Sequence, residues 1–161
     1  MSYFRGMEPR WSQLWDALVE TPFGLYGAWE RQINDACGVN GLVFHVLQTI
    51  ARSDDKRLRL QDLADAVRHS QSGTTRLVDR LERDGLVVRH FCQEDRRVTW
   101  AQLSPKGQEI YEKATPLWEA FLQEHLTQVL GPEQADTLKS LLERVQSSLL
   151  PGQAACPGAL D

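Results

Sequence analysis

A run of small, polar and uncharged residues opens the segment SQSGTTRLVDRLERDGLVVR, residues 70–89. Leu77, Val78 and Leu81 follow at the spacing of one helix face, which predicts a helix with a polar beginning and an apolar remainder. Hydroxyl and amide groups there can hydrogen-bond to the edges of bases, and small side chains let the backbone come close to a groove. We therefore predict contact with nucleic acid through Ser70, Gln71, Ser72, Thr74, Thr75 and Arg76.

Arginines farther along this helix have a different interpretation. Arg80 and Arg83 alternate with Asp79, Glu82 and Asp84. Opposite charges three or four residues apart on a helix form surface ion pairs that stabilise it by a few tenths of a kcal/mol. We expect such pairs here rather than contacts with DNA.

A second group of candidate residues lies in the stretch CQEDRR, residues 92–97, between two predicted strands, LVVRHF and VTWAQL. The guanidinium groups of Arg96 and Arg97 carry a fork of donors that suits a phosphate or a narrow minor groove. Asp95 would be repelled by DNA, so we expect it to brace an arginine across the loop. Asp95, Arg96 and Arg97 are thus the predicted tip of a β-hairpin wing.

Local signals delimit the elements that position these residues. Ser70 is a natural N-cap, and Gly85 ends the helix that it begins. A short helix is predicted over 60–67, and the charged stretch DDKR before it reads as a loop. Two helices joined by a tight turn and followed by a hairpin are typical of a winged helix-turn-helix.

Further helices flank this motif. Helical spacing predicts a helix over 9–20, and the pattern resumes after Pro22 and continues to about 36. Pro22 either begins a second helix or kinks a continuous one. Asn40 caps the next predicted helix. Ser104 and Pro105 begin a long helix that runs to about 130 with a kink at Pro116, and a last helix covers 133–149.

The chain is therefore predicted to be mainly α with a small β-hairpin wing. A winged helix-turn-helix over residues 39–104 is flanked by an N-terminal helical region, 1–38, and by C-terminal helices over 105–150. Residues 151–161 are rich in Gly, Pro and Ala and are predicted to be a disordered tail.

Charge distribution agrees with a nucleic-acid surface in the middle of the chain. The net charge is −4, but residues 56–106 hold 11 Lys or Arg against 7 Asp or Glu, and the remainder holds 7 against 15. No run of about 18 apolar residues is present, so no membrane contact is expected. The beginning of the chain has no signal-peptide pattern, and three widely spaced cysteines are compatible with a reducing cytoplasm.

Motifs for other chemistry are not found. No phosphate loop, G-x-S-x-G or His-Glu-x-x-His occurs, so neither an enzyme nor a cofactor is predicted. No paired His or Cys spacing indicates a metal site. Two alternatives stay open: a winged helix that binds protein rather than DNA, and a thiol-responsive regulator in which Cys92, beside Arg89 and His90, is the reactive group.

These motifs resemble those of the MarR (multiple antibiotic resistance regulator) family. The similarity covers residues 10–149 and is most specific in LQDLADAV, TTRLVDRLERDGLVVR and DRRVTWAQLSPKG. The chain departs from the family pattern at Arg59, where a Ser or Thr cap is common, at His69, which is commonly apolar, and at Gly73 in the first turn of the recognition helix.

The resemblance implies a homodimer in which the terminal helices of two chains intertwine, bound to a palindromic operator in double-stranded DNA. It also implies a repressor that a small-molecule effector releases. Aromatic and polar residues of the second half of the first helix and of the helix after Asn40 are candidates for the effector pocket: Phe23, Tyr26, Trp29, Arg31, Phe44 and His45.

Overall fold

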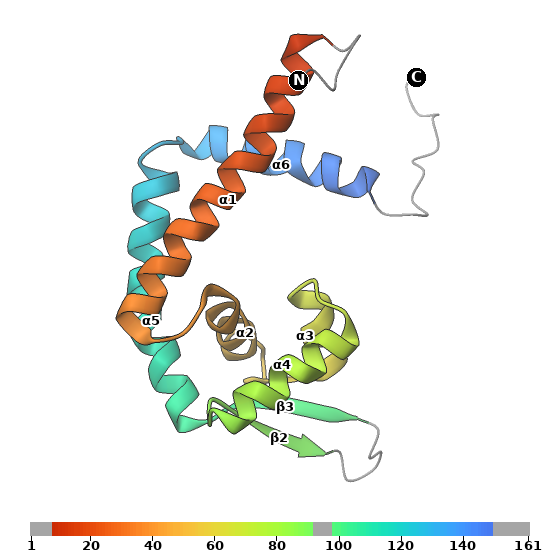
Figure 1. Ribbon diagram of the computed structural model, residues 1–161, viewed down its shortest axis with the longest axis vertical. Coiled ribbons are helices and arrows are strands. Elements are labelled where there is room, and N and C mark those ends of the chain that lie inside the picture. Colours follow the sequence, from red (N-terminus) through yellow and green to blue (C-terminus); the bar gives the residue numbers. More distant parts are fainter. Residues whose placement is uncertain (1–7, 92–97, 150–161) are drawn as a thin grey trace, which may run out of the picture. The chain divides into compact units, whose positions relative to one another are not determined.

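The computed structural model describes residues 8–91 and 98–149. These residues fall into two compact units, divided between Glu119 and Ala120. The first unit contains α1, α2, β1, α3, α4, β2, β3 and most of α5 (Figure 1). Mainly helical structure with a small antiparallel sheet confirms the predicted fold class.

Helix α1 runs without interruption over Pro9–Cys37, with Pro22 inside it. The restart at Pro22 that the sequence allowed is therefore wrong, and the continuous helix is correct. Gly38 ends α1 in the left-handed region at φ 67°, and its N–H donates to the Asn34 carbonyl at 2.8 Å. Glycine adopts this conformation without steric cost, which makes it a common helix terminator.

The winged helix-turn-helix consists of α2 (Gly41–Ala51), β1 (Arg57–Arg59), α3 (Leu60–Ala66), α4 (Gln71–Arg83), β2 (Val87–Phe91) and β3 (Thr99–Leu103). The strands form an antiparallel sheet in the order β1-β3-β2. Strand β1 lies between the charged stretch DDKR and α3, where only a loop was expected from the sequence. Asn40 caps α2 as predicted, because its side chain accepts the Val43 N–H at 2.8 Å.

Apolar side chains from α2, α3, α4 and the sheet form one core. Its fully buried members include Val46, Leu47, Ile50, Leu63, Val78, Leu81 and Ala101. The tight turn between α3 and α4 requires Arg68 to adopt φ 55°, and the next N–H, of His69, donates to the Ala64 carbonyl at 3.0 Å. This turn sets the direction in which α4 leaves α3.

The end of α4 and the beginning of α5 (Pro105–Leu122) are joined closely. The Ser104 N–H donates to the Leu86 carbonyl at 3.0 Å, and the Ser104 hydroxyl donates to the Gly85 carbonyl at 2.6 Å. The same hydroxyl oxygen accepts the Gly107 N–H at 3.0 Å. Helix α5 therefore begins against the segment that links α4 to the wing.

The second unit contains the end of α5, a π-helical turn η1 (Gln123–Thr127) and α6 (Pro132–Ser148). The last helix is separate from α5, as predicted, and begins at Pro132 after the N-cap Gly131. Pro116 lies inside α5 without ending it, and α-helical geometry stops at Leu122 instead of continuing to about 130. Side chains of α6 are all exposed within the described residues.

Candidate nucleic-acid interface

The beginning of α4 is capped by its own side chains. Ser70 is the N-cap, and its hydroxyl oxygen accepts the Gly73 N–H at 3.1 Å. A Cβ on Gly73 would lie 3.0 Å from this oxygen, so glycine leaves room for the cap. Such a cap stabilises a helix by about 1 kcal/mol. The beginning of α4, residues 70–76, which we call its reading end, is thus formed without a ligand.

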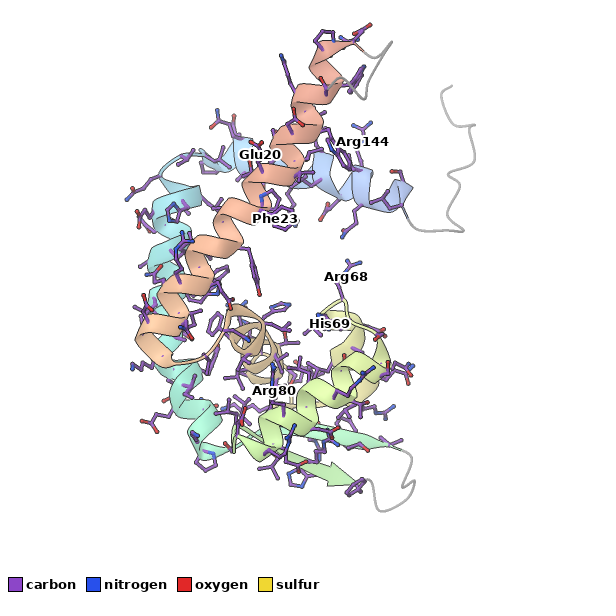
Figure 2. All side chains as sticks on the ribbon, viewed as in Figure 1. Glu20, Phe23, Arg68, His69, Arg80 and Arg144 are labelled. Atoms are coloured by element: carbon purple, nitrogen blue, oxygen red, sulfur yellow. The ribbon has the colours of Figure 1, made fainter. Side chains whose placement is uncertain are left out.

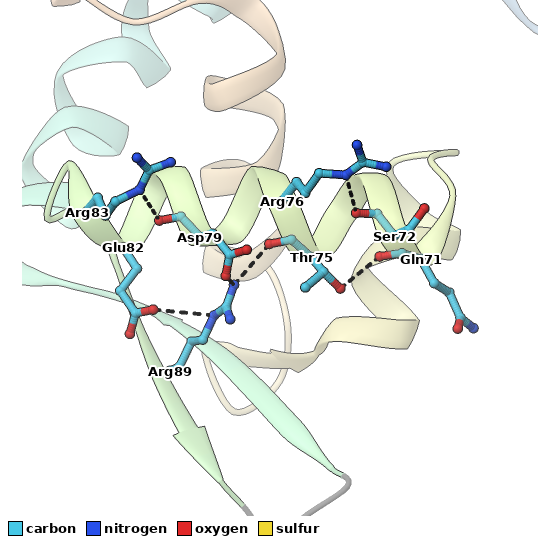
Figure 3. Close-up of polar contacts among 8 residues, drawn as sticks. All are labelled: Gln71, Ser72, Thr75, Arg76, Asp79, Glu82, Arg83 and Arg89. Atoms are coloured by element: carbon cyan, nitrogen blue, oxygen red, sulfur yellow. Dashed lines mark hydrogen bonds and ion pairs between the residues drawn. The ribbon is translucent and has the colours of Figure 1, made fainter.

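Polar side chains of this first turn also bond to the backbone of α4 (Figure 3). The Thr75 hydroxyl donates to the Gln71 carbonyl at 2.9 Å, and Arg76 Nε donates to the Ser72 carbonyl at 3.3 Å. The Gln71 amide projects away from the helix in Figure 3. Ser70, Gln71, Ser72, Thr75 and Arg76 are all exposed, so their side chains can meet a ligand.

Thr74 does not belong to this exposed set, and this part of the prediction is wrong. Its side chain is fully buried. It lies three and four residues before Leu77 and Val78 and shares their face toward the core. The Thr74 hydroxyl has no hydrogen-bond partner among the described residues. A buried hydroxyl without a partner destabilises a protein by about 1–3 kcal/mol.

Arg89 on β2 holds the wing to α4 (Figure 3). Its guanidinium group lies 2.6 Å from Asp79 Oδ1 and 3.5 Å from Glu82 Oε2, and it donates to the Thr75 carbonyl at 3.0 Å. Only 15% of the Arg89 side chain is exposed, so water screens these contacts less than those of a surface pair. We call Arg89 with Asp79 and Glu82 the α4–β2 clamp.

The clamp changes the interpretation of the other charges on α4. Asp79 and Glu82 pair with Arg89 across elements, whereas ion pairs with Arg80 and Arg83 along the helix were expected from the sequence. Arg83 Nε instead donates to the Asp79 carbonyl at 3.3 Å. Figure 2 shows Arg80 on α4, and Arg68 and His69 at the α3–α4 turn.

The predicted wing residues Asp95, Arg96 and Arg97 lie outside the described residues, as does Cys92. The strands that lead to them are in place, with Phe91 opposite Thr99 at the far end of the ladder. The arginines of β1 were not among the predicted site residues, because a three-residue strand of mostly charged residues resembles a loop. Arg59 occupies the N-cap position of α3 without a side-chain capping bond.

The candidate effector residues separate into a buried and an exposed set. Trp29 and Phe44 are buried, with ring centroids 5.2 Å apart, and Trp118 lies 4.9 Å from Trp29. Phe23 and Tyr26 are 75% and 53% exposed. Arg31 and His45 are also exposed. Trp29 and Phe44 therefore belong to an aromatic core, whereas the other four can reach solvent.

Two titratable groups in this set have shifted pKa values. Desolvation raises the pKa of Tyr26 above its usual 10.0, and the nearby Glu30 carboxylate raises it further. The protein around the His45 imidazole removes part of its hydration, which lowers its pKa below the usual 6.5.

The described part of the chain shows neither a cluster of metal ligands nor a membrane-spanning helix. No group of three or more His, Cys, Asp or Glu side chains gathers there in a way that could hold a metal ion. No helix of residues 8–91 and 98–149 has the length and apolar character needed to cross a membrane.

Comparison with known proteins supports a regulator of transcription. A family model described as MarR family matches residues 38–98. The HTH-type transcriptional regulator MhqR of Bacillus subtilis is 32% identical over 122 residues, which cover 71% of this chain and 82% of that protein. The transcriptional repressor MprA of Escherichia coli is 28% identical over 114 residues, which cover 71% of this chain and 64% of MprA.

Solved structures agree in fold. Sco3205, a MarR family transcriptional regulator from Streptomyces coelicolor whose structure contains DNA, superposes with a TM-score of 0.86 at 26% identity over 94% of this chain and 96% of its own. AbsC, a MarR family transcriptional regulator from the same organism, superposes with a TM-score of 0.84 at 27% identity. The match covers 91% of this chain and 98% of AbsC. The chain therefore belongs to the MarR family of winged helix-turn-helix transcriptional regulators, which bind DNA and are not enzymes.

Proposed function

We propose that the chain is a homodimeric repressor that binds a palindromic operator in double-stranded DNA and is released from it by a small-molecule effector. The observation that carries the DNA-reading part is the exposed, uncharged beginning of α4. Its backbone is capped by Ser70, while Gln71 and Thr75 stay accessible. An end of this kind fits the major groove, where hydroxyl and amide groups distinguish base pairs.

The contacts divide into two roles. Side chains of α4 read bases in the major groove, and residues of the wing bind phosphates or the minor groove. The proposed readers are the exposed residues Ser70, Gln71, Ser72, Thr75 and Arg76. The proposed wing contacts are Arg96 and Arg97, oriented by Asp95.

Exposed apolar side chains in both units support a dimer. In α1, Trp11, Leu14 and Trp15 are each about half exposed or more. In the second unit, η1 and α6 border an apolar groove of about 700 Å³. The α6 side chains with the greatest apolar exposure are Leu138, Leu141, Leu142 and Val145, at 43–50% exposed. Apolar surface on this scale favours burial against a second copy.

The regulatory part rests on two lines of support. MprA, one of the relatives, is named a transcriptional repressor. Phe23 and Tyr26 offer exposed aromatic surface on α1, the helix that also carries the buried Trp29, and such surface suits an apolar ligand with few polar anchors. Arg31 and His45 are the proposed anchors.

Selection of bound genomic fragments by the purified protein tests the DNA-reading proposal. We expect a palindrome whose half-sites lie about 10 base pairs apart, centre to centre. Gln71→Ala should change which bases are preferred at one position of each half-site, whereas Arg80→Ala should leave the preferred sequence unchanged. Enrichment of no sequence, or the same palindrome with Gln71→Ala, would contradict the assignment of α4.

Leu141→Asp with Leu142→Asp on α6 tests the dimer. Both side chains are nearly half exposed, so the change leaves the described core intact. Analytical ultracentrifugation should show a dimer for the parent and a monomer for the variant, with loss of binding to the full palindrome. A variant that remains dimeric would place the interface elsewhere.

Titration of small aromatic compounds into the operator complex tests release. A compound that dissociates the complex should be needed at a higher concentration with Phe23→Ala, because its ring loses a contact. Equal potency on parent and variant would move the effector site away from this part of α1.

A further inference from the structure

The outward face of the sheet carries positive and aromatic side chains. Arg59 lies opposite Trp100 in the β1–β3 ladder, and His90 lies opposite Trp100 in the β2–β3 ladder. Directly paired residues in antiparallel strands project from the same face, as do residues two apart in one strand. Arg57, Arg59, Val88, His90, Trp100 and Gln102 therefore share this face, and none of the six is a carboxylate.

Trp100 holds two guanidinium groups at once. The Cζ atoms of Arg57 and Arg59 each lie 5.0 Å from the centroid of the Trp100 ring. A tryptophan face attracts a cation, and this attraction offsets part of the repulsion between two like charges. The result is a pair of cations fixed in place by one ring.

These cations have little opposing charge nearby. Arg57 contacts Asp55 at 3.5 Å, with both side chains about half exposed or more, and such surface pairs contribute little. Among the described residues, no carboxylate lies within ion-pair distance of Arg59. Within the part of the chain that the structure describes, the positive charges of Arg57 and Arg59 are therefore largely uncompensated and available for an external anion.

At the edge of the sheet, Arg59 also approaches the beginning of α4. Arg59 borders a hollow of about 340 Å³ together with Gln61, Gln71, Thr75 and Arg89. Gln71 and Thr75 are proposed readers of bases. A DNA duplex that contacts them would thus bring its backbone near the edge of the sheet where Arg59 lies.

We propose that Arg57 and Arg59, held by Trp100, bind phosphates of the DNA strand that flanks the groove occupied by α4. This assignment rests on the proposed placement of α4 in the major groove. Guanidinium groups bind phosphate through two parallel N–H donors. Stacking on Trp100 restricts both side chains in the free protein, so less side-chain freedom is lost when DNA binds.

The dependence of operator affinity on salt concentration tests the proposal. Each phosphate contact contributes a slope of about −0.9 to the logarithm of the binding constant against the logarithm of salt concentration. Arg57→Gln with Arg59→Gln should weaken operator binding and reduce this slope by about 2 per protomer, without changing the preferred sequence. Arg57→Lys with Arg59→Lys keeps the charges and should retain most of the slope.

Arg10→Gln with Arg52→Gln is the matched control, because it removes the same number of charges from the beginning of α1 and the end of α2. Its slope should stay close to that of the parent. Thermal unfolding of each variant checks that the sheet remains folded. A folded Arg57→Gln/Arg59→Gln protein with the parent's slope and affinity would overturn the proposal and leave an acidic protein segment as the partner of this face. Failure of the parent itself to bind an operator would instead refute the proposed function.

Discussion

Gly107 in the first turn of α5 provides the sharpest test of how the helices are joined. A Cβ at this position would lie 2.0 Å from the Leu86 carbonyl oxygen, at least 1.0 Å closer than real Cβ atoms approach. The same oxygen accepts the Ser104 N–H, so α5 cannot move away without loss of that hydrogen bond. Gly107→Ala must therefore strain or open this joint.

The magnitude follows from three contributions. Overpacking of a buried site destabilises by about 1–3 kcal/mol. Loss of the Ser104 to Leu86 hydrogen bond costs about 1 kcal/mol more. Alanine is preferred to glycine in a helix by up to about 1 kcal/mol, which offsets part of this. The net expectation is a loss of about 1–4 kcal/mol in the free energy of unfolding.

Urea denaturation followed by circular dichroism measures this loss. Gly24→Ala in α1 is the control, because no atom lies within 4 Å of its added Cβ. It should leave stability unchanged or raise it by up to about 1 kcal/mol. If Gly107→Ala unfolded within about 0.5 kcal/mol of the parent, the close approach of α5 to Leu86 would not determine stability, and the reasoning would be wrong.

Three further changes have defined outcomes. Thr74→Val removes a buried hydroxyl that has no hydrogen-bond partner among the described residues. It should raise the free energy of unfolding, measured in urea, by about 1 kcal/mol and leave operator affinity unchanged. Weaker operator binding would restore Thr74 as a base contact. Arg89→Ala removes the α4–β2 clamp and should lower the free energy of unfolding by about 2 kcal/mol. Operator binding should be weaker, but the dependence of affinity on salt concentration should be unchanged. A reduced salt dependence would instead make Arg89 a phosphate contact. The lowered pKa of His45 favours the neutral imidazole in the folded state, so stability should be greatest above about pH 6.5 and decline as the pH falls toward the folded pKa. His45→Gln should flatten this decline in thermal unfolding measured from pH 5 to 8, and an unchanged profile would assign the decline to another group.

Elements with local signals were predictable from the sequence. Ser70 and Asn40 cap helices, and Gly38 ends one, because each acts on its own neighbours in the chain. Thr74 was within reach of the same reasoning, since it lies at helical spacing from Leu77, Val78 and Leu81. Because its neighbours are polar, Thr74 was assigned to the exposed face. Spacing rather than side-chain type decides which residues of a helix face the core.

Features that depend on distant pairing were not predictable. Strand β1 has three residues and forms only because β3, more than forty residues later, supplies its hydrogen-bond partner. The clamp joins Arg89 to carboxylates on α4 that could equally have paired along their own helix. The stack of two arginines on Trp100 depends on the register between β1 and β3. A one-residue slip in that register would place the ring on the opposite face.

The anchoring of α4 has a consequence for the thermodynamics of recognition. The Ser70 cap, the buried Thr74 side chain and the α4–β2 clamp restrict the reading end before DNA arrives. The conformational entropy of ordering this end is therefore lost during folding rather than on binding. Operator affinity consequently depends on residues that touch no base. A substitution that loosens α4 transfers the ordering cost to the binding step and weakens the complex while every contact to DNA can still be made.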